Sequence, residues 1–107
     1  MQEANVIRSL SALAHEARLR VFRALVVAGP EGLIPSALAE QLGIAPNALS
    51  FHLKELANAQ LINQERQGRN VVYRAQFSVM NDLLAYLTEN CCQGASCTTA
   101  SSTSCNC

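Results

Sequence analysis

The segment Pro35–Leu56, which reads PSALAEQLGIAPNALSFHLKEL, decides the fold of this chain. Pro35 and Pro46 each stand where a helix can begin, because the fixed φ of proline suits the first helical position. Gly43 follows the first apolar stretch and can end that helix in the left-handed conformation. The segment therefore predicts two helices joined by a short turn, which is the layout of a helix-turn-helix.

Two more helices are predicted before this segment. Residues 3 to 13 carry apolar side chains at helical spacing. A second helix is predicted over His15–Val27, with its apolar stripe formed by Leu19, Phe22, Leu25 and Val26. Its polar face would hold Arg18, Arg20 and Arg23. Gly and Pro at residues 29 to 32 end this helix.

After Gln60 the apolar pattern changes from the helical period to alternation. Residues 61–66 and 71–75 read as two strands, and the stretch between them contains Gly68, as expected of a hairpin turn. A last helix is predicted over Val79–Glu89. The fold class is therefore mainly α with one small β-hairpin, in the order α-α-α-α-β-β-α.

Composition limits where this chain works and what it binds. Its 107 residues suffice for one domain. We assign residues 1–90 to this domain and residues 91–107 to a flexible Gly/Ser/Thr-rich tail. No signal peptide precedes it and no apolar run could span a membrane, so we expect a cytoplasmic protein. The net charge of zero argues weakly against nucleic-acid binding, but residues 45–74 hold four basic and two acidic side chains.

The cysteines form the second informative pattern. All five lie in the last seventeen residues, at Cys91, Cys92, Cys97, Cys105 and Cys107. Cytoplasmic thiols stay reduced, and an odd number leaves one thiol over in any fully paired disulfide scheme. Clustered thiols in such a tail suit capture of a soft metal or metalloid, or redox chemistry.

Four motifs together resemble the ArsR/SmtB family of metal-responsive winged-helix repressors. They are ALAHEARLR at residues 12–20, LSFHLKEL at 49–56, AQLI at 59–62 and RQGRNVVY at 66–73. The resemblance covers about residues 4 to 90. It implies a winged helix-turn-helix, a homodimer on a palindromic operator, and repression that an inducer relieves. It does not imply an enzyme.

The inducer site departs from two patterns of that family. The third helix, Ser36–Leu42, lacks the cysteines of the founding arsenic repressors. The zinc site of the last helix cannot form either, because no histidine follows His52. The tail instead resembles the subgroup that binds As(III) with a vicinal cysteine pair and a third thiol, here Cys91, Cys92 and Cys97.

Sulfur chemistry supports that inducer class. As(III) and Sb(III) are soft centres that take three thiolates in a pyramid. No organic cofactor is implied. The sequence leaves open whether Cys105 and Cys107 are dispensable or accessory, and whether the thiol site forms within one chain or between two.

The fourth helix provides the predicted DNA-reading residues. Leu49, Leu53 and Leu56 would form its buried face, so the side chains facing the major groove or phosphates would be Asn47, Ser50, Phe51 and Lys54. His52 lies between the two faces, and either helix packing or a DNA contact suits it. In the wing, Arg69 beside Gly68 is placed for the minor groove or its phosphates.

The first and last helices have apolar faces that one small domain cannot cover completely. We therefore expect them to pair across a two-fold axis and bury Val6, Ile7, Leu10, Leu83, Leu84 and Leu87. Completion of the monomer core is the alternative reading of these residues.

Two other functions remain from the sequence. A redox regulator of the same fold would oxidise a cysteine pair, and a repressor responsive to Cd(II) or Zn(II) would use the same thiols. A thiol enzyme is disfavoured, because a reactive cysteine needs an activating basic neighbour and none occurs from Cys91 onward.

Overall fold

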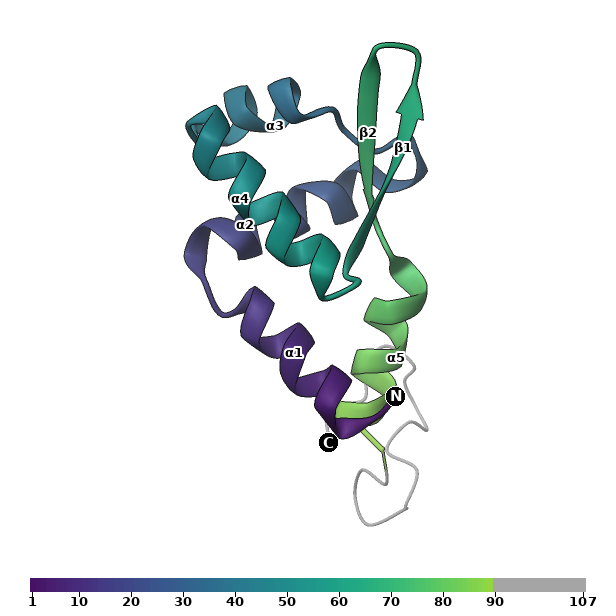
Figure 1. Ribbon diagram of the computed structural model, residues 1–107. Coiled ribbons are helices and arrows are strands. Elements are labelled where there is room, and N and C mark those ends of the chain that lie inside the picture. The colour runs from purple at the N-terminus through teal and green to yellow at the C-terminus, as the bar shows by residue number, and fades with distance from the viewer. Residues whose placement is uncertain (90–107) are drawn as a thin grey trace.

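The computed structural model describes residues 1–89 of the chain. Its elements are α1 (Glu3–Leu13), α2 (Glu16–Ala28), the short 3-10 helix η1 (Gly29–Glu31), α3 (Pro35–Leu42), α4 (Pro46–Asn58), β1 (Ile62–Gln67), β2 (Asn70–Ala75) and α5 (Phe77–Leu87) (Figure 1). This order confirms the winged helix-turn-helix. The predicted tail and all five cysteines lie outside the described residues.

The ends of the helices follow from single residues. Pro35 and Pro46 occupy first-turn positions of α3 and α4. Gly43 ends α3 in the left-handed conformation at φ 66°, and its backbone N–H donates to the carbonyl of Ala39. The side chain of His15 caps α2, because its Nδ1 accepts the backbone N–H of Ala17 at 3.1 Å.

Helix α2 begins and ends one residue later than predicted, and the hairpin and α5 also differ from their predicted bounds. The hairpin is longer than expected, since Gln67 pairs with Asn70 and only Gly68 and Arg69 form the turn. Helix α5 begins at Phe77 and ends at Leu87, two residues earlier than predicted at each end. It begins earlier because the carbonyl of Gln76 already accepts the backbone N–H of Met80, while Phe77 packs against the core.

The core lies between α2, α3, α4 and the base of the hairpin. The predicted inner face of α4 is confirmed, with Leu49, Leu53 and Leu56 at most 3% exposed. The predicted stripe of α2 is partly wrong, because Leu19 is 46% exposed. The buried side chains of α2 are instead Val21, Phe22, Ala24 and Leu25.

The hairpin is fixed at its base to the segment between α2 and α3. Leu33 and Tyr73 exchange two backbone hydrogen bonds of 2.9 Å. The Arg74 guanidinium donates to the carbonyl of Pro30 at 2.7 Å and to Glu65 at 2.8 Å. The same guanidinium lowers the pKa of the Glu65 carboxyl, together with a hydrogen bond from Gln67. These contacts hold the wing at a defined angle to the helices.

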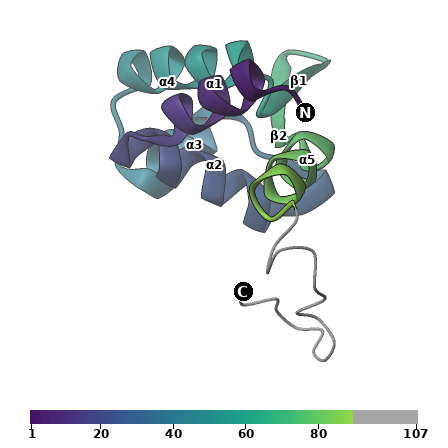
Figure 2. The same ribbon diagram turned by 90° about the horizontal axis from the view of Figure 1, so that it is seen from below.

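Helix α1 contacts both α4 and α5. Figure 1 shows α1 and α5 side by side at the end of the domain away from the hairpin tip, and Figure 2 shows α1 beside α4. None of the helices within residues 1–89 is both long and apolar enough to cross a membrane.

Gly32 is the position where the wing contact tolerates no side chain. Its φ is +67°, and an added Cβ would lie 2.5 Å from the carbonyl oxygen of Tyr73. Gly43 provides a matched control, since its φ is +66° but an added Cβ meets no atom within 4 Å. We expect Gly43→Ala to lower the free energy of unfolding by about 1 to 2 kcal/mol, the cost of the left-handed conformation. Gly32→Ala should cost a further ~1 to 3 kcal/mol for the steric clash, as urea unfolding would measure. Equal losses in the two variants would contradict the close approach.

Candidate nucleic-acid interface

The outward face of α4 is the candidate reading surface. Burial of its three leucines against the core turns the predicted residues Asn47, Ser50, Phe51 and Lys54 outward, and all four are exposed. Phe51 is 53% exposed, which is high for a large apolar side chain. The surface therefore combines an amide, a hydroxyl, an aromatic ring and an ammonium group. These are the groups that contact base edges and phosphates in helix-turn-helix proteins.

His52 packs against the start of α2 and is only partly exposed. Its Nδ1 accepts a hydrogen bond from Nε of Arg18 at 3.4 Å, and its ring lies 4.8 Å from the ring of His15, between centroids. Partial burial and, to a lesser extent, the nearby His15 and Arg18 lower the pKa of His52. A neutral ring suits this place, because the ring must accept the N–H of Arg18. Of the two roles left open for His52, the geometry favours packing.

Arg18 joins α2 to the reading surface, and sequence reasoning missed it. Its guanidinium carbon lies 5.5 Å from the centre of the Phe51 ring, within the range of a cation–π contact. The sequence pattern predicts that Arg18 lies on the polar face of α2, yet this residue lies one helical turn before the buried Val21 and Phe22. Centring the apolar stripe on these two residues would have placed Arg18 toward α4.

The two histidines are poorly arranged to bind a metal ion together. Each Nδ1 already accepts an N–H, from Ala17 for His15 and from Arg18 for His52. A metal ion bound at either Nδ1 would have to displace that hydrogen bond. More widely, residues 1–89 contain no group of three His, Cys, Asp or Glu side chains placed to hold a metal ion.

The wing adds positive charge at its tip and along β1. Arg69 lies in the two-residue turn next to Gly68, whose φ is 64°. Arg66 on β1 is also exposed. Arg74, by contrast, is engaged with Glu65 and Pro30, so this residue holds the wing and adds no free charge to it.

The six predicted dimer residues fall into two groups. Val6 and Leu83 are 4% and 6% exposed, so they are already buried within one chain. The others are large apolar side chains left in solvent, namely Ile7 (60%), Leu10 (42%), Leu84 (53%) and Leu87 (53%). The α1 and α5 helices that carry them are in contact. The apolar surface that a partner could cover is therefore formed by these four residues.

Comparison with known proteins agrees with this geometry. A family model described as a helix-turn-helix domain matches residues 13–65. No significant match occurs among curated protein sequences. Among solved structures, an ArsR-like transcriptional regulator from Rhodococcus sp. RHA1 aligns with 27% identity and a TM-score of 0.71, over 78% of this chain and 76% of that one. The AntR antimony-specific transcriptional repressor aligns with 32% identity and a TM-score of 0.62, over 78% and 75% of the two chains. This chain belongs to the ArsR family.

The helix-turn-helix match and the similarity to the ArsR-like and AntR regulators make this protein a DNA-binding transcriptional regulator. A more distant structure shares the fold. It is the homodimeric winged helix-turn-helix domain of Mb0332 from Mycobacterium bovis, with 23% identity and a TM-score of 0.66 over 79% of this chain and 77% of that one. The matched region of the family model runs from the end of α1 through α4 and into β1, and thus contains the candidate reading surface.

Proposed function

We propose that this ArsR-family protein is a repressor that binds a palindromic operator as a homodimer and is released by As(III) or Sb(III). The observation that carries the proposal is a combination. The chain is 32% identical to an antimony-specific repressor, and its thiol trio Cys91, Cys92 and Cys97 follows closely after α5.

DNA binding is assigned to the outward face of α4 and to the wing. In this proposal Asn47 and Ser50 contact base edges or backbone oxygens, and Lys54 binds a phosphate. Phe51 packs against the sugar-phosphate backbone or a thymine methyl group. Arg69 reaches the minor groove or its phosphates from the tip of the wing. His52 supports this surface from behind by accepting the hydrogen bond of Arg18.

Dimerisation is assigned to the exposed apolar residues of α1 and α5. A two-fold axis there would bury Ile7 and Leu10 with Leu84 and Leu87, while Val6 and Leu83 support them from the core. Such an interface would fix the distance between two copies of α4, which a palindromic operator requires.

Release from the operator requires thermodynamic linkage between the thiol site and the DNA surface. As(III) can weaken operator binding only if it binds more tightly to a dimer that fits the operator poorly. The thiol trio follows α5 in sequence, so closing a three-sulfur site there would act on the end of the proposed dimer helix. That displacement would change the spacing of the two α4 helices.

If the DNA surface is correctly placed, removing a positive charge from it should weaken operator binding, and removing one elsewhere should not. Lys54→Ala and Arg69→Ala should weaken operator binding and make it less dependent on salt, because each removes a phosphate contact. Arg23→Ala is the matched control, since Arg23 lies on the exposed outer side of α2, away from Arg18. Fluorescence anisotropy at several salt concentrations measures both effects. If Lys54→Ala and Arg69→Ala behaved like the control, the surface would be wrongly placed.

The dimer surface predicts that one charge on α5 dissociates the protein. Leu84→Glu or Leu87→Glu places an unpaired carboxylate in the apolar interface, which costs several kcal/mol. We expect a folded monomer by analytical ultracentrifugation. Val27→Glu is the control, because Val27 on α2 is 75% exposed and lies outside this surface. Variants of Leu84 and Leu87 that stay dimeric would remove α5 from the interface.

The thiol assignment predicts that variants of the trio still repress but no longer respond to arsenite. Ser in place of Cys91, Cys92 or Cys97 leaves the DNA surface unchanged, but a hydroxyl is a poor ligand for a soft centre. Each variant should therefore repress a reporter gene yet ignore arsenite, while truncation after Ala100 should respond nearly as the parent does. Normal induction of Cys97→Ser would mean that a different set of sulfurs binds the inducer. Release by peroxide or Cd(II) alone would favour the alternative inducers.

A further inference from the structure

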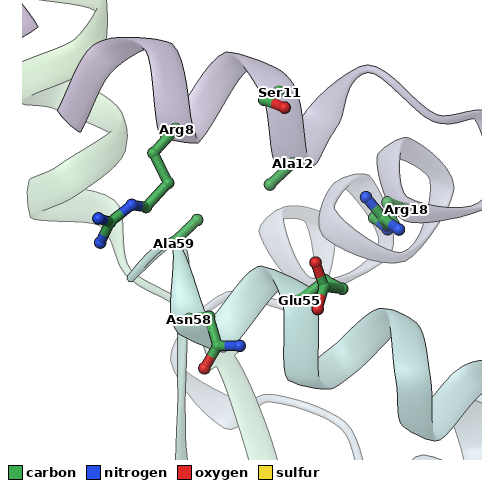
Figure 3. Close-up of a pocket in the computed structure, with 7 residues that line it drawn as sticks. All are labelled: Arg8, Ser11, Ala12, Arg18, Glu55, Asn58 and Ala59. Carbon is green, nitrogen blue, oxygen red and sulfur yellow. The ribbon is translucent and has the colours of Figure 1, made fainter. Parts of the chain in front are cut away.

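A groove between α1 and α4 lies next to the reading surface and was not expected from the sequence. Its volume is about 270 Å³, and its polar lining consists of Arg8, Ser11, Arg18, Glu55 and Asn58, with two alanines. Figure 3 shows the Arg8 and Arg18 side chains on opposite sides of Glu55 and Asn58, which project from α4. We call it the α1–α4 groove.

Both arginines keep donors available for an anion. Within residues 1–89, neither Arg8 nor Arg18 forms a salt bridge, whereas Arg20 and Arg74 do. The one hydrogen bond of Arg18 in this range uses Nε, which leaves its two terminal nitrogens for a ligand. An arginine held at Nε and by a ring is preorganised to bind a phosphate through those nitrogens.

The groove adjoins the proposed DNA surface. Arg18 touches Phe51 and His52, which precede Lys54 on the same helix. Helix α1 runs beside α4 on one side of the domain (Figure 2). Ser11 and Asn58 add a hydroxyl and an amide, which commonly bind DNA phosphates. Glu55 opposes an anion, but two arginines against one carboxylate leave a positive excess.

We propose that the α1–α4 groove is a second phosphate-binding site for operator DNA, in which Arg8 and Arg18 bind backbone phosphates beside the bases that α4 contacts. This inference rests on the proposed DNA-binding role of α4. Because α1 also carries the proposed dimer residues Ile7 and Leu10, the phosphates bound by Arg8 lie toward the centre of the operator, between the two half-sites.

The test is the salt dependence of operator binding by the full-length protein. Arg8→Ala removes one phosphate contact per chain and two per dimer, so the slope of log K against log[salt] should become shallower by about two units. Arg18→Gln should do the same. Both variants should lose affinity equally for operator and for unrelated duplex DNA, since phosphates carry no sequence information. Arg8→Lys should keep most of the slope, and Glu55→Gln should bind DNA more tightly than the parent.

A neutral phosphate analogue locates the contact. Methylphosphonates between the two half-sites should weaken binding by the parent but leave binding by Arg8→Ala unchanged. Suppose that Arg8→Ala and Arg18→Gln kept the parental salt-dependence slope while Lys54→Ala had a shallower slope. The groove would then not bind DNA, although α4 would. If Lys54→Ala and Arg69→Ala also kept the parental slope, the proposed DNA surface itself would be wrong. Melting temperatures equal to that of Arg23→Ala exclude unfolding as the cause of a loss.

Discussion

Burial of one face of α4 is the constraint on which the DNA-facing surface depends. Leu49, Leu53 and Leu56 are almost completely buried with α2, α3 and the base of the hairpin. Each fully buried leucine contributes about 1.5 to 3 kcal/mol relative to an exposed one. Rotating the helix would therefore remove a large part of the roughly 5 to 15 kcal/mol that stabilises a small domain. The rotation of α4 is therefore fixed, and Asn47, Ser50, Phe51 and Lys54 must face outward. Arg18, His52 and His15 add polar contacts at the edge of this apolar packing.

A second fixed contact sets the wing against the helices. Gly32 allows the backbone before α3 to approach β2, and Leu33 pairs with Tyr73 through an isolated antiparallel bridge. Arg74 closes the same junction through Pro30 and Glu65. As a result, Arg69 at the wing tip and the outward face of α4 belong to one body, which is needed for simultaneous contacts in neighbouring grooves. Of the basic residues in this region, Arg74 serves the fold, whereas Lys54, Arg66 and Arg69 remain exposed to a partner.

Strong local signals explain what the sequence could predict. Pro35, Gly43 and Pro46 mark helix ends by their own backbone preferences, and the leucine period of α4 identifies its inner face. The stripe of α2 was harder, because Leu19 and Val21 are both apolar and only the packing shows which one is buried. The same error hid Arg18, whose place beside Phe51 depends on how α2 crosses α4. Likewise, the sequence shows that α1 and α5 have apolar faces. Only the tertiary structure shows which of these residues are buried within one chain, namely Val6 and Leu83, and which are exposed, namely Ile7, Leu10, Leu84 and Leu87.

The proposed repressor joins a rigid DNA-reading domain to a thiol trio, and its central claim is that the two sites are thermodynamically linked. Linkage is reciprocal, so operator DNA must weaken As(III) binding by the same factor by which As(III) weakens operator binding. The most direct measurement is therefore the affinity of the full-length, reduced protein for As(III), with and without saturating operator, by competition against a chromophoric dithiol. We predict tighter binding of As(III) to the free protein, at one ion per three-thiol site, and no operator effect in Cys97→Ser. Equal As(III) affinity with and without operator would contradict the account.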